Sequence, residues 1–469
     1  PKVYDNGLLK DAPDFFKHTA PIGKEFLKDG EAYTLQVSVE DCTGCNLCYE
    51  VCPIESKVEK GHKAINMHEV APLLETEKRN WDFFLSLPDI DRTRINRSTV
   101  KGSQLLEPLF EFSGACSGCG ETPYIKLLTQ LFGDRMMVAN ATGCSSIFGG
   151  NLPTTPWTKN NEGCGPAWAN TLFEDNAEFG LGIKLASDKK REYAFNILKL
   201  IREEVGAELA DAIIANEETV EAEIILQCKN VTALKRRLRE MNSDKSKILL
   251  TIADFLQKKS MWIIGGDGWA YDIGFSGLDH VLSTGENINI LVLDTEVYSN
   301  TGGQKSKSTP VGASAKFSIK GKTTGKKDLA MQAIAHGTAF VAEIAMGSND
   351  VHALKTLLEA EAYPGPSIVI AYSHCIAHGY EIHNGLEQQA MAVKSGYWPL
   401  FRYNPLKEQG QRFVLDSKDP SVALEDFMYQ ENRFATIKNT MPERGAEFLQ
   451  MANVALKNRW DRIAALKNL

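Results

Sequence analysis

The chain lacks any long apolar run. No stretch of its 469 residues reaches the ~18 consecutive apolar residues that a membrane-spanning helix needs. It also lacks an excess of basic charge, because 52 Lys and Arg stand against 60 Asp and Glu, a net charge of −8. A dedicated nucleic-acid-binding protein normally carries a basic patch or a basic isoelectric point. We therefore expect a cytoplasmic enzyme that neither spans a membrane nor binds nucleic acid.

Internal repeats, low-complexity tracts and an initiator methionine are also missing. The chain begins Pro1-Lys2-Val3 and has no apolar core of a signal peptide, so we expect a piece of a longer polypeptide. Its composition, 43% hydrophobic and 24% charged, is ordinary for a protein with a packed core. At ~150 residues per domain, the length allows about three domains.

The first cysteine run has a specific spacing. Cys42, Cys45, Cys48 and Cys52-Pro53 form C-x2-C-x2-C-x3-C-P, the spacing of bacterial ferredoxins. Three of these thiolates reach three irons of one [4Fe-4S] cluster, and in two-cluster proteins the fourth cysteine ligates the other cluster. Zinc or a redox dithiol is the alternative, but zinc sites do not normally use this spacing. Because a second run is absent, residues 1–70 are predicted to be the C-terminal half of a two-cluster ferredoxin-like domain.

Short apolar runs separated by helical patterns predict an α/β fold. The predicted strands are residues 136–139, 261–264, 288–293, 339–342 and 367–371. Alternation of strands and helices indicates a doubly wound, mostly parallel sheet. We expect a linker over 71–110, the sheet domain over 111–400 with a helical insertion over 184–260, and a C-terminal helical arm over 401–469.

Chemically useful residues follow four of the predicted strands. The four segments are Thr142-Gly143-Cys144, Gly265-Gly266-Asp267-Gly268, Asp294 to Asn300, and Tyr372-Ser373-His374-Cys375. In open α/β sheets, function sits at the carboxyl ends of the strands, so these segments are expected to meet at one edge.

Four further thiols are expected to converge there. Cys116 and Cys119 alone indicate little, but Cys144 and Cys375 each follow a strand, and together they make four convergent thiols. The residues alone leave two interpretations open, an iron–sulfur cluster and a structural zinc site with four thiolate ligands.

The motif Gly266-Asp267-Gly268 is similar to a thiamine diphosphate motif. Glycine lets the backbone approach a diphosphate, and the helix that follows points its N-terminus at the phosphates. Asp267 offers Mg²⁺ a hard oxygen, Thr295 a hydroxyl and Val297 a carbonyl, while Asn300 lies further along the same loop. The usual motif has Asn where Thr295 stands, and threonine still leaves an oxygen ligand.

Two cysteines lie outside these groups. Cys228 is predicted to be a buried core residue beside Ile224, Ile225 and Leu226. Cys164 has no evident partner in the sequence and is not assigned as a ligand.

The chain resembles the pyruvate:ferredoxin (flavodoxin) oxidoreductases, the single-chain 2-oxoacid type. The resemblance extends over nearly the whole chain and rests on specific motifs. These motifs are FSGACSGCGETPY from Phe112, ATGCSSI from Ala141, GPAWAN from Gly165, FEDNAEFG from Phe173, GDGWAYDIG from Gly266, YSNTGGQ from Tyr298 and SHCIAHG from Ser373.

The resemblance implies the cofactors and the site residues. It implies that Cys116, Cys119, Cys144 and Cys375 hold the [4Fe-4S] cluster nearest thiamine diphosphate. It implies Mg²⁺ on Asp267, Thr295 and the Val297 carbonyl, with Asn300 at the diphosphate. It implies that Cys42, Cys45 and Cys48 hold a ferredoxin-type cluster, and that Cys52 ligates another.

The resemblance also implies the reaction and the partners. Pyruvate and coenzyme A would give acetyl-CoA and CO₂, with electrons passing through the clusters to ferredoxin or flavodoxin. A missing N-terminal half would carry the glutamate that activates the thiamine and most pyruvate contacts, and we expect a homodimer. Three alternatives stay open: a non-redox thiamine-dependent decarboxylase, another 2-oxoacid:ferredoxin oxidoreductase, and an electron-transfer module.

Overall fold

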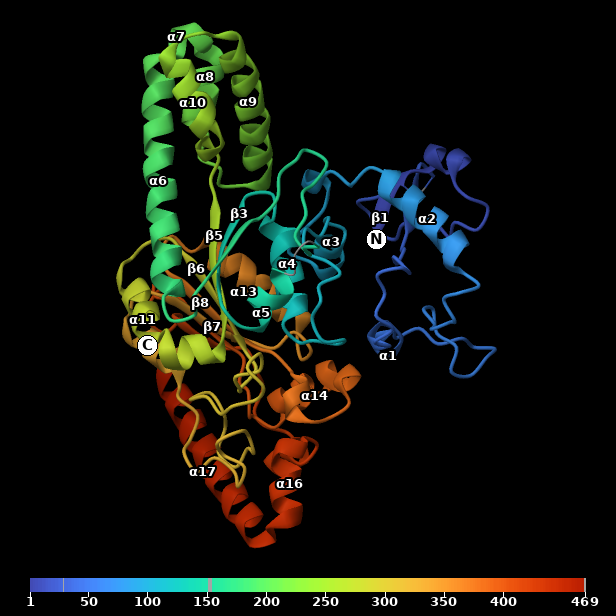
Figure 1. Cartoon of the computed structure of the whole chain (residues 1–469), viewed down its shortest axis with the longest axis vertical. Helices are drawn as coiled ribbons and strands as arrows, with labels where there is room; N and C mark the ends of the chain where they lie inside the picture. The colour runs from blue at the N-terminus through green and yellow to red at the C-terminus, as the bar shows by residue number, and fades with distance from the viewer. Residues whose placement is uncertain (28, 151–153, 468–469) are drawn as a thin grey trace.

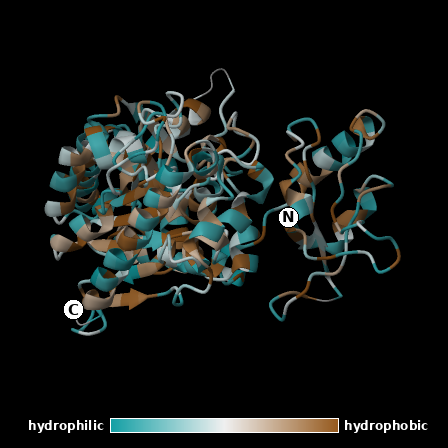
Figure 2. Cartoon of the chain, turned by 90° about the horizontal axis from the view of Figure 1, so that it is seen from below, coloured by the Kyte–Doolittle hydropathy of each residue, from teal (hydrophilic) through white to brown (hydrophobic). Residues whose placement is uncertain are grey.

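The computed structural model describes residues 1–27, 29–150 and 154–467. Figure 1 shows a central sheet covered by helices, a bundle of long helices that projects from one end of it, and an N-terminal segment that lies to one side. In Figure 2 the N-terminal segment is again separated from the main body, and brown, apolar strands run through that body.

The central sheet has eight strands in the order β10-β9-β7-β8-β6-β5-β3-β4. Their bounds are β3 (Met136–Ala141), β4 (Ala167–Thr171), β5 (Ser260–Gly266), β6 (Asn289–Asp294), β7 (Phe340–Ile344), β8 (Ser367–Tyr372), β9 (Phe401–Tyr403) and β10 (Phe413–Leu415). Six strands run parallel to one another, in the order β7, β8, β6, β5, β3 and β4. Strand β9 pairs antiparallel with β7, and β10 pairs antiparallel with β9. The predicted mostly parallel α/β sheet is confirmed, and all five predicted strands belong to it.

Alternate residues of each buried strand point to opposite faces of the sheet. In β5, Trp262 and Ile264 belong to one apolar cluster, whereas Ile263 belongs to the other. Helices α4 (Thr122–Phe132) and α13 (Asp350–Ala362) complete the first cluster. Helices α11 (Phe275–Ser283) and α12 (Leu329–Ala335) complete the second. Because both faces are covered, the strands read as continuous apolar runs rather than as an alternating pattern.

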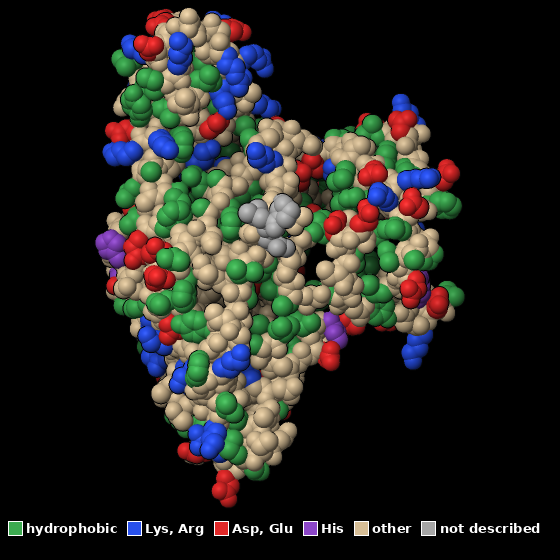
Figure 3. Space-filling model, in the orientation of Figure 1, with side chains coloured by type: hydrophobic (Ala, Val, Ile, Leu, Met, Phe, Trp, Pro, Cys, Tyr) green, Lys and Arg blue, Asp and Glu red, His purple; other side chains and the backbone are tan. Residues whose placement is uncertain are grey.

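The insertion has an apolar core of its own. It consists of α6 (Asn176–Leu200), α7 (Arg202–Val205), α8 (Ala207–Ala215), α9 (Glu221–Glu240) and α10 (Asp244–Ile252). Leu198, Ile213, Leu234 and Leu249 are buried together between these helices. Helix α6 begins before the predicted start at residue 184, because its first turns pack on the sheet. Lys, Arg, Asp and Glu side chains cover the projecting end of the bundle (Figure 3).

The C-terminal region differs from the helical arm predicted over 401–469. It first adds β9 and β10 to the sheet and only then forms α15 (Leu424–Met428), α16 (Asn432–Thr440) and α17 (Pro442–Leu466). Phe401 and Tyr403 are buried on either side of the half-buried Arg402. Strands of three residues are too short to show a period in the sequence, so the prediction missed them.

The N-terminal region contains few regular elements. They are β1 (Lys2–Asp5), β2 (Glu31–Thr34), α1 (Leu47–Val51), α2 (Leu74–Ser86) and α3 (Val100–Gln104). A small apolar cluster of Tyr4, Phe16, Ala32, Phe84 and Leu87 joins α2 to the first strands. None of the described helices is both long and apolar enough to cross a membrane.

Candidate active site

The sheet order brings the predicted segments to one edge. Strands β8, β6, β5 and β3 are consecutive neighbours and all parallel, so their carboxyl ends lie side by side. The segments that begin at Tyr372, Asp294, Gly266 and Ala141 therefore leave the sheet at the same edge. Helix α5 (Cys144–Gly149) begins there directly after β3.

Three oxygen atoms converge beside the end of β5. The Thr295 hydroxyl oxygen lies 3.0 Å from Asp267 Oδ1 and 3.0 Å from the Val297 carbonyl oxygen. The Asp267 carboxylate is almost completely buried, and Ser306 donates a hydrogen bond to its second oxygen. Burial and the neighbouring Asp294 raise the pKa of Asp267 well above its usual range.

These three residues fit a divalent cation. A buried carboxylate is unfavourable as an anion unless a cation compensates it. Carboxylate, hydroxyl and carbonyl oxygens are the ligands that Mg²⁺ accepts, and Mg²⁺ usually keeps further positions for water and phosphate. The site thus has the right donors and a deficit of positive charge.

The glycine motif permits close packing at this site. A Cβ on Gly268 would lie 2.5 Å from the Tyr298 ring, whose hydroxyl donates a hydrogen bond to the Gly268 carbonyl oxygen at 3.3 Å. The segment Gly268–Ile273 that follows is a π-helix, which leads into α11. Asn300 lies further along the loop and is exposed, so its side chain is accessible to a ligand at this edge.

Two loops of the four-cysteine group are joined by His374. Its ring Nε2 lies 2.9 Å from the Gly118 carbonyl oxygen, and its own carbonyl oxygen accepts a hydrogen bond from Gly120 N–H at 3.1 Å. A Cβ on Gly120 would lie 2.5 Å from the His374 backbone nitrogen, so only glycine fits there. This contact brings the Cys116–Cys119 loop against the segment that carries Cys375.

Three thiols of this group, those of Cys119, Cys144 and Cys375, are half-buried, and that of Cys116 is exposed. Burial raises the pKa of Cys144 to about 12 and that of Cys375 to about 11, and it raises the pKa of Cys119 further. Negative charge on Cys116 and on the buried Glu121 adds to the rise for Cys144 and Cys375. Thiolates would form here only with a strong positive charge at their centre, which is what an iron–sulfur cluster supplies.

The arrangement of these side chains does not match a single metal ion. Over the described parts of the chain, no three His, Cys, Asp or Glu side chains converge closely enough to hold one ion as they stand. Zinc would need its sulfurs at about 2.3 Å from one point.

Ser299, which the sequence analysis did not single out, connects the two groups. Its hydroxyl oxygen lies 3.3 Å from Cys144 Sγ and 3.4 Å from the Thr295 hydroxyl oxygen. The cysteine group is therefore adjacent to the cation site. In the sequence, only its position in the loop after β6 could have indicated that Ser299 lies at the site.

A buried charged network supports the loop that carries Thr295. Lys326 Nζ lies 2.9 Å from Asp294 Oδ2 and 2.9 Å from Glu296 Oε1, on either side of Thr295 in the chain. Arg433 lies 2.8 Å from the second oxygen of Glu296. Burial disfavours the Glu296 anion, but Lys326 and Arg433 prevail and lower its pKa to about 2. His378 Nε2 lies 2.8 Å from the Thr295 carbonyl oxygen.

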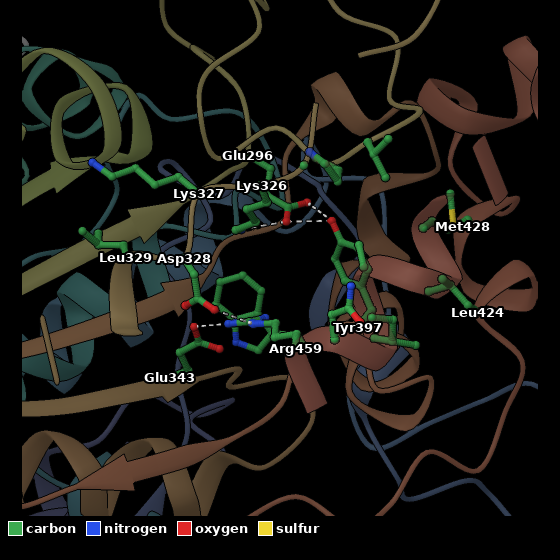
Figure 4. Close-up of a pocket in the computed structure, with 18 of the residues that line it drawn as sticks. Glu296, Lys326, Lys327, Asp328, Leu329, Glu343, Tyr397, Leu424, Met428 and Arg459 are labelled. Atoms are coloured by element: carbon green, nitrogen blue, oxygen red, sulfur yellow. Dashed lines mark hydrogen bonds and ion pairs between the residues drawn. The ribbon is translucent and has the colours of Figure 1, made fainter. Parts of the chain in front are cut away.

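Figure 4 shows the cavity beside this network. Its volume is about 300 Å³, and it lies between the sheet and the C-terminal helices. Glu296 and Tyr397 point toward each other across it, and Arg459 from α17 pairs with Glu343 of β7. The C-terminal helices thus help to hold the loop of the cation site.

The ferredoxin-type run lies in an irregular loop that ends in α1. Gly44 and Asn46 have left-handed backbone conformations, which turn the chain sharply between the cysteines. Burial raises the pKa of Cys48, and negative charge on Cys45 and Cys42 raises it further. The Cys52 thiol faces the Ile54 carbonyl oxygen at 3.8 Å. Cys42 and Cys45 act electrostatically on Cys48 and so lie near it.

Helix α1 also contacts the turn Ile382–Asn384. A Cβ on Gly118 would lie 3.2 Å from the Ile382 side chain, so the same turn touches the Cys116–Cys119 loop. The ferredoxin-type cysteine run and the four-cysteine group therefore lie against the same turn.

The prediction for Cys228 is wrong. Its side chain is only half-buried and lies outside the apolar core of the insertion. It contacts Cys164, for which the sequence showed no partner. The apolar residues before Cys228 suggested a core face, but this position of α9 faces the loop before β4.

Comparison with known proteins finds two family models and several relatives that match this chain. Residues 249–371 match the thiamine pyrophosphate enzyme C-terminal TPP binding domain, and residues 35–56 match the 4Fe-4S binding domain. The chain is 54% identical over 98% of its length to pyruvate-flavodoxin oxidoreductase of Trichormus variabilis. It is 50% identical over 99% to the probable pyruvate-flavodoxin oxidoreductase of Escherichia coli, and 46% identical over 98% to pyruvate:ferredoxin oxidoreductase of Moorella thermoacetica.

The chain spans 39% of the length of each of these three relatives. Among solved structures, a 2-oxoglutarate:ferredoxin oxidoreductase from Magnetococcus marinus aligns with a TM-score of 0.36 and 13% identity, covering 62% of this chain and 70% of its own. At that score the likeness has no bearing on fold or function.

Proposed function

Because the chain is homologous over nearly its whole length to a portion of the pyruvate-flavodoxin and pyruvate:ferredoxin oxidoreductases, we propose that it serves the same reaction. Pyruvate and coenzyme A are converted to acetyl-CoA and CO₂, and the electrons leave through [4Fe-4S] clusters to ferredoxin or flavodoxin. The observation that carries the proposal is the contact series from Thr295 through Ser299 to Cys144, which joins the cation site to the cysteine group.

In this proposal the oxygen atoms at the end of β5 bind Mg²⁺. Asp267, Thr295 and the Val297 carbonyl are the protein ligands, and the diphosphate completes the coordination. The backbone of Gly266 and Gly268 and the exposed side chain of Asn300 would contact the diphosphate. Lys326, Arg433 and His378 hold the loop so that Thr295 keeps its position.

The cysteines hold the electron carriers. Cys116, Cys119, Cys144 and Cys375 ligate the cluster beside the thiamine, and Cys42, Cys45 and Cys48 ligate a second one. Cys52 ligates a further cluster, as the spacing of two-cluster ferredoxins implies. The contact of α1 with the Ile382–Asn384 turn supports passage of electrons between the first two clusters.

Bound thiamine diphosphate supplies the carbon nucleophile and bound clusters accept single electrons, while the protein supplies position and environment. Asp267 and its neighbours Asp294 and Thr295 are buried. Low exposure to water strengthens the electrostatic contacts that would hold a diphosphate near a cation at Asp267.

The proposal is tested on a polypeptide of the relatives' full length that contains this chain, because the proposed N-terminal half carries the glutamate that activates the thiamine. The protein is purified anaerobically, and the reduction of methyl viologen with pyruvate and coenzyme A is followed. We expect reduction that needs both substrates and that is lost in Cys144→Ser while thiamine diphosphate binding persists. Release of CO₂ without viologen reduction would instead indicate a non-redox thiamine-dependent decarboxylase. Absence of Mg²⁺-dependent thiamine diphosphate binding would indicate an electron-transfer module.

Substrate and assembly are tested separately. Comparison of pyruvate with 2-oxoglutarate in the same assay distinguishes the proposed substrate from another 2-oxo acid. The proposal includes a homodimer and a cytoplasmic location, which size-exclusion chromatography and cell fractionation test.

A further inference from the structure

Two thiols outside the proposed cofactor sites contact each other. Cys164 lies in the loop before β4, and Cys228 lies on α9 of the insertion. Although they are far apart in sequence, both line one cavity, and each thiol shifts the pKa of the other. Neither residue is part of a proposed cluster site.

Hydrogen bonds and ion pairs hold the two segments that carry Cys164 and Cys228. In the loop, Asn160 Oδ1 accepts a hydrogen bond from Cys164 N–H at 2.9 Å, and Asn160 N–H donates to the Cys164 carbonyl oxygen at 2.8 Å. At the start of α9, Glu221 pairs with Arg92 at 2.6 Å and with Arg97 at 2.5 Å. These contacts hold the Cys164 loop in its own conformation and hold the start of α9 against the segment of Arg92 and Arg97.

Small reagents can reach the pair. Both cysteines are half-buried and line a cavity of about 360 Å³. Charged residues line the same cavity, among them Asp134, Glu162 and Lys229. A thiol that is accessible and has a second thiol beside it is the arrangement found in redox-sensitive cysteines.

The two thiols have different reactivity. The hydrogen bond from Cys228 lowers the pKa of Cys164 to about 7, against the effects of burial and of Glu162 and Asp134, whereas Lys259 assists it. The same hydrogen bond and burial raise the pKa of Cys228. Cys164 is therefore the thiolate that attacks, and Cys228 remains a protonated partner.

We propose that Cys164 and Cys228 form a redox modification site, which a peroxide oxidises to a disulfide and a dithiol reductant restores. The Cys164 thiolate attacks one peroxide oxygen, which breaks the O–O bond, gives a sulfenic acid and releases water once protonated. The Cys228 sulfur then attacks the sulfenic sulfur, so the S–S bond forms, the S–O bond breaks and a second water leaves. Overall, two thiols lose two electrons and two protons, and one peroxide is reduced to two waters. A dithiol reverses the change by becoming a disulfide itself.

The bond would tie the insertion to the segment that enters β4. Strand β4 is the edge strand of the sheet and pairs with β3, which leads into Cys144. Oxidation is thus expected to reduce the motion of residues 160–171 against α9 without using a cluster ligand.

Peptide mapping tests the proposal on the whole chain. Trypsin releases residues 160–184 and 203–229, each with a single cysteine, so a disulfide between them gives one cross-linked species. We expect this species after one equivalent of hydrogen peroxide, followed by alkylation of free thiols. It should disappear after treatment with dithiothreitol and be absent in Cys164→Ser and in Cys228→Ala.

Alkylation rates give a second measurement, independent of peroxide. At pH 7, Cys164 should react with iodoacetamide roughly fivefold or more faster than Cys228, because about half of it is thiolate. Cys228→Ala should slow the alkylation of Cys164 severalfold, while circular dichroism confirms that the variant folds. Oxidation of Cys164 to sulfinic acid with Cys228 left as a free thiol, or equal alkylation rates, would overturn the proposal.

Discussion

Replacement of Asp267 with Asn should have opposite effects on cofactor affinity and on the stability of the free protein. The carboxylate is buried, lies 3.0 Å from the Thr295 hydroxyl and has Asp294 nearby. Asparagine keeps the shape and one oxygen but removes the charge. A cation bound here loses its only charged ligand among the three proposed ones.

The expected loss of affinity follows from the value of a charged contact. Hydrogen bonds and similar contacts to a charged group contribute about 1.5–3 kcal/mol, which corresponds to roughly a 10- to 150-fold weaker binding of Mg²⁺ with thiamine diphosphate. Without ligand, removal of a buried charge beside Asp294 should stabilise the fold. A gain of about 1 kcal/mol would raise the Tm by roughly 2 °C in a protein of this size.

Titration with thiamine diphosphate at fixed Mg²⁺, followed by the fluorescence of the nearby Trp269, measures the affinity. Differential scanning calorimetry measures the Tm without ligand. Asp279→Asn is the matched control, since Asp279 lies on α11 with a half-exposed side chain and pairs with His336. Unchanged affinity in Asp267→Asn would refute the cation site. A Tm lowered by several degrees would show that the carboxylate is structural instead.

Three further outcomes test other parts of the site. Cys144→Ser should lower the iron bound after anaerobic reconstitution and change the visible absorption, whereas Cys228→Ser should retain the iron of the unaltered protein; equal losses would contradict the ligand assignment. Gly120→Ala should lower the free energy of unfolding by about 1–3 kcal/mol in urea denaturation, because its Cβ would lie 2.5 Å from the His374 backbone nitrogen. Gly182→Ala in α6 should raise the free energy of unfolding by about 0.5–1 kcal/mol, because a Cβ there meets open space. Arg433→Met should cost about 3–5 kcal/mol at neutral pH, because it removes the cation paired with the buried Glu431 and leaves only Lys326 of the two cations described beside the buried Glu296. The pKa of Glu296 is held at about 2, below its unfolded value, so its contribution to stability is present above about pH 4.5 and is lost as the pH falls toward 2. The difference between Arg433→Met and the unaltered protein should therefore shrink over that pH range, and a constant difference would refute the ion pair.

Features encoded in short, continuous segments could be predicted from the sequence. Five buried strands were visible as apolar runs, because both faces of the parallel sheet are covered and nearly every residue of these strands is buried. The ferredoxin spacing from Cys42 and the Gly266–Gly268 motif depend on neighbouring residues, and family profiles match both regions. Convergence of the strand ends followed from the rule that parallel strands present their carboxyl ends at one edge.

Contacts between segments that are distant in sequence could be identified only from the tertiary structure. Ser299 touches Cys144, and Lys326 joins the two carboxylates that flank Thr295; no local pattern marks either contact. The short strands β9 and β10 have too few residues to show a period. The pairing of Cys164 with Cys228 depends on the direction in which α9 returns to the sheet, which is set by the packing of the whole insertion. Local sequence specifies which groups are available, whereas packing between distant segments specifies which of them meet.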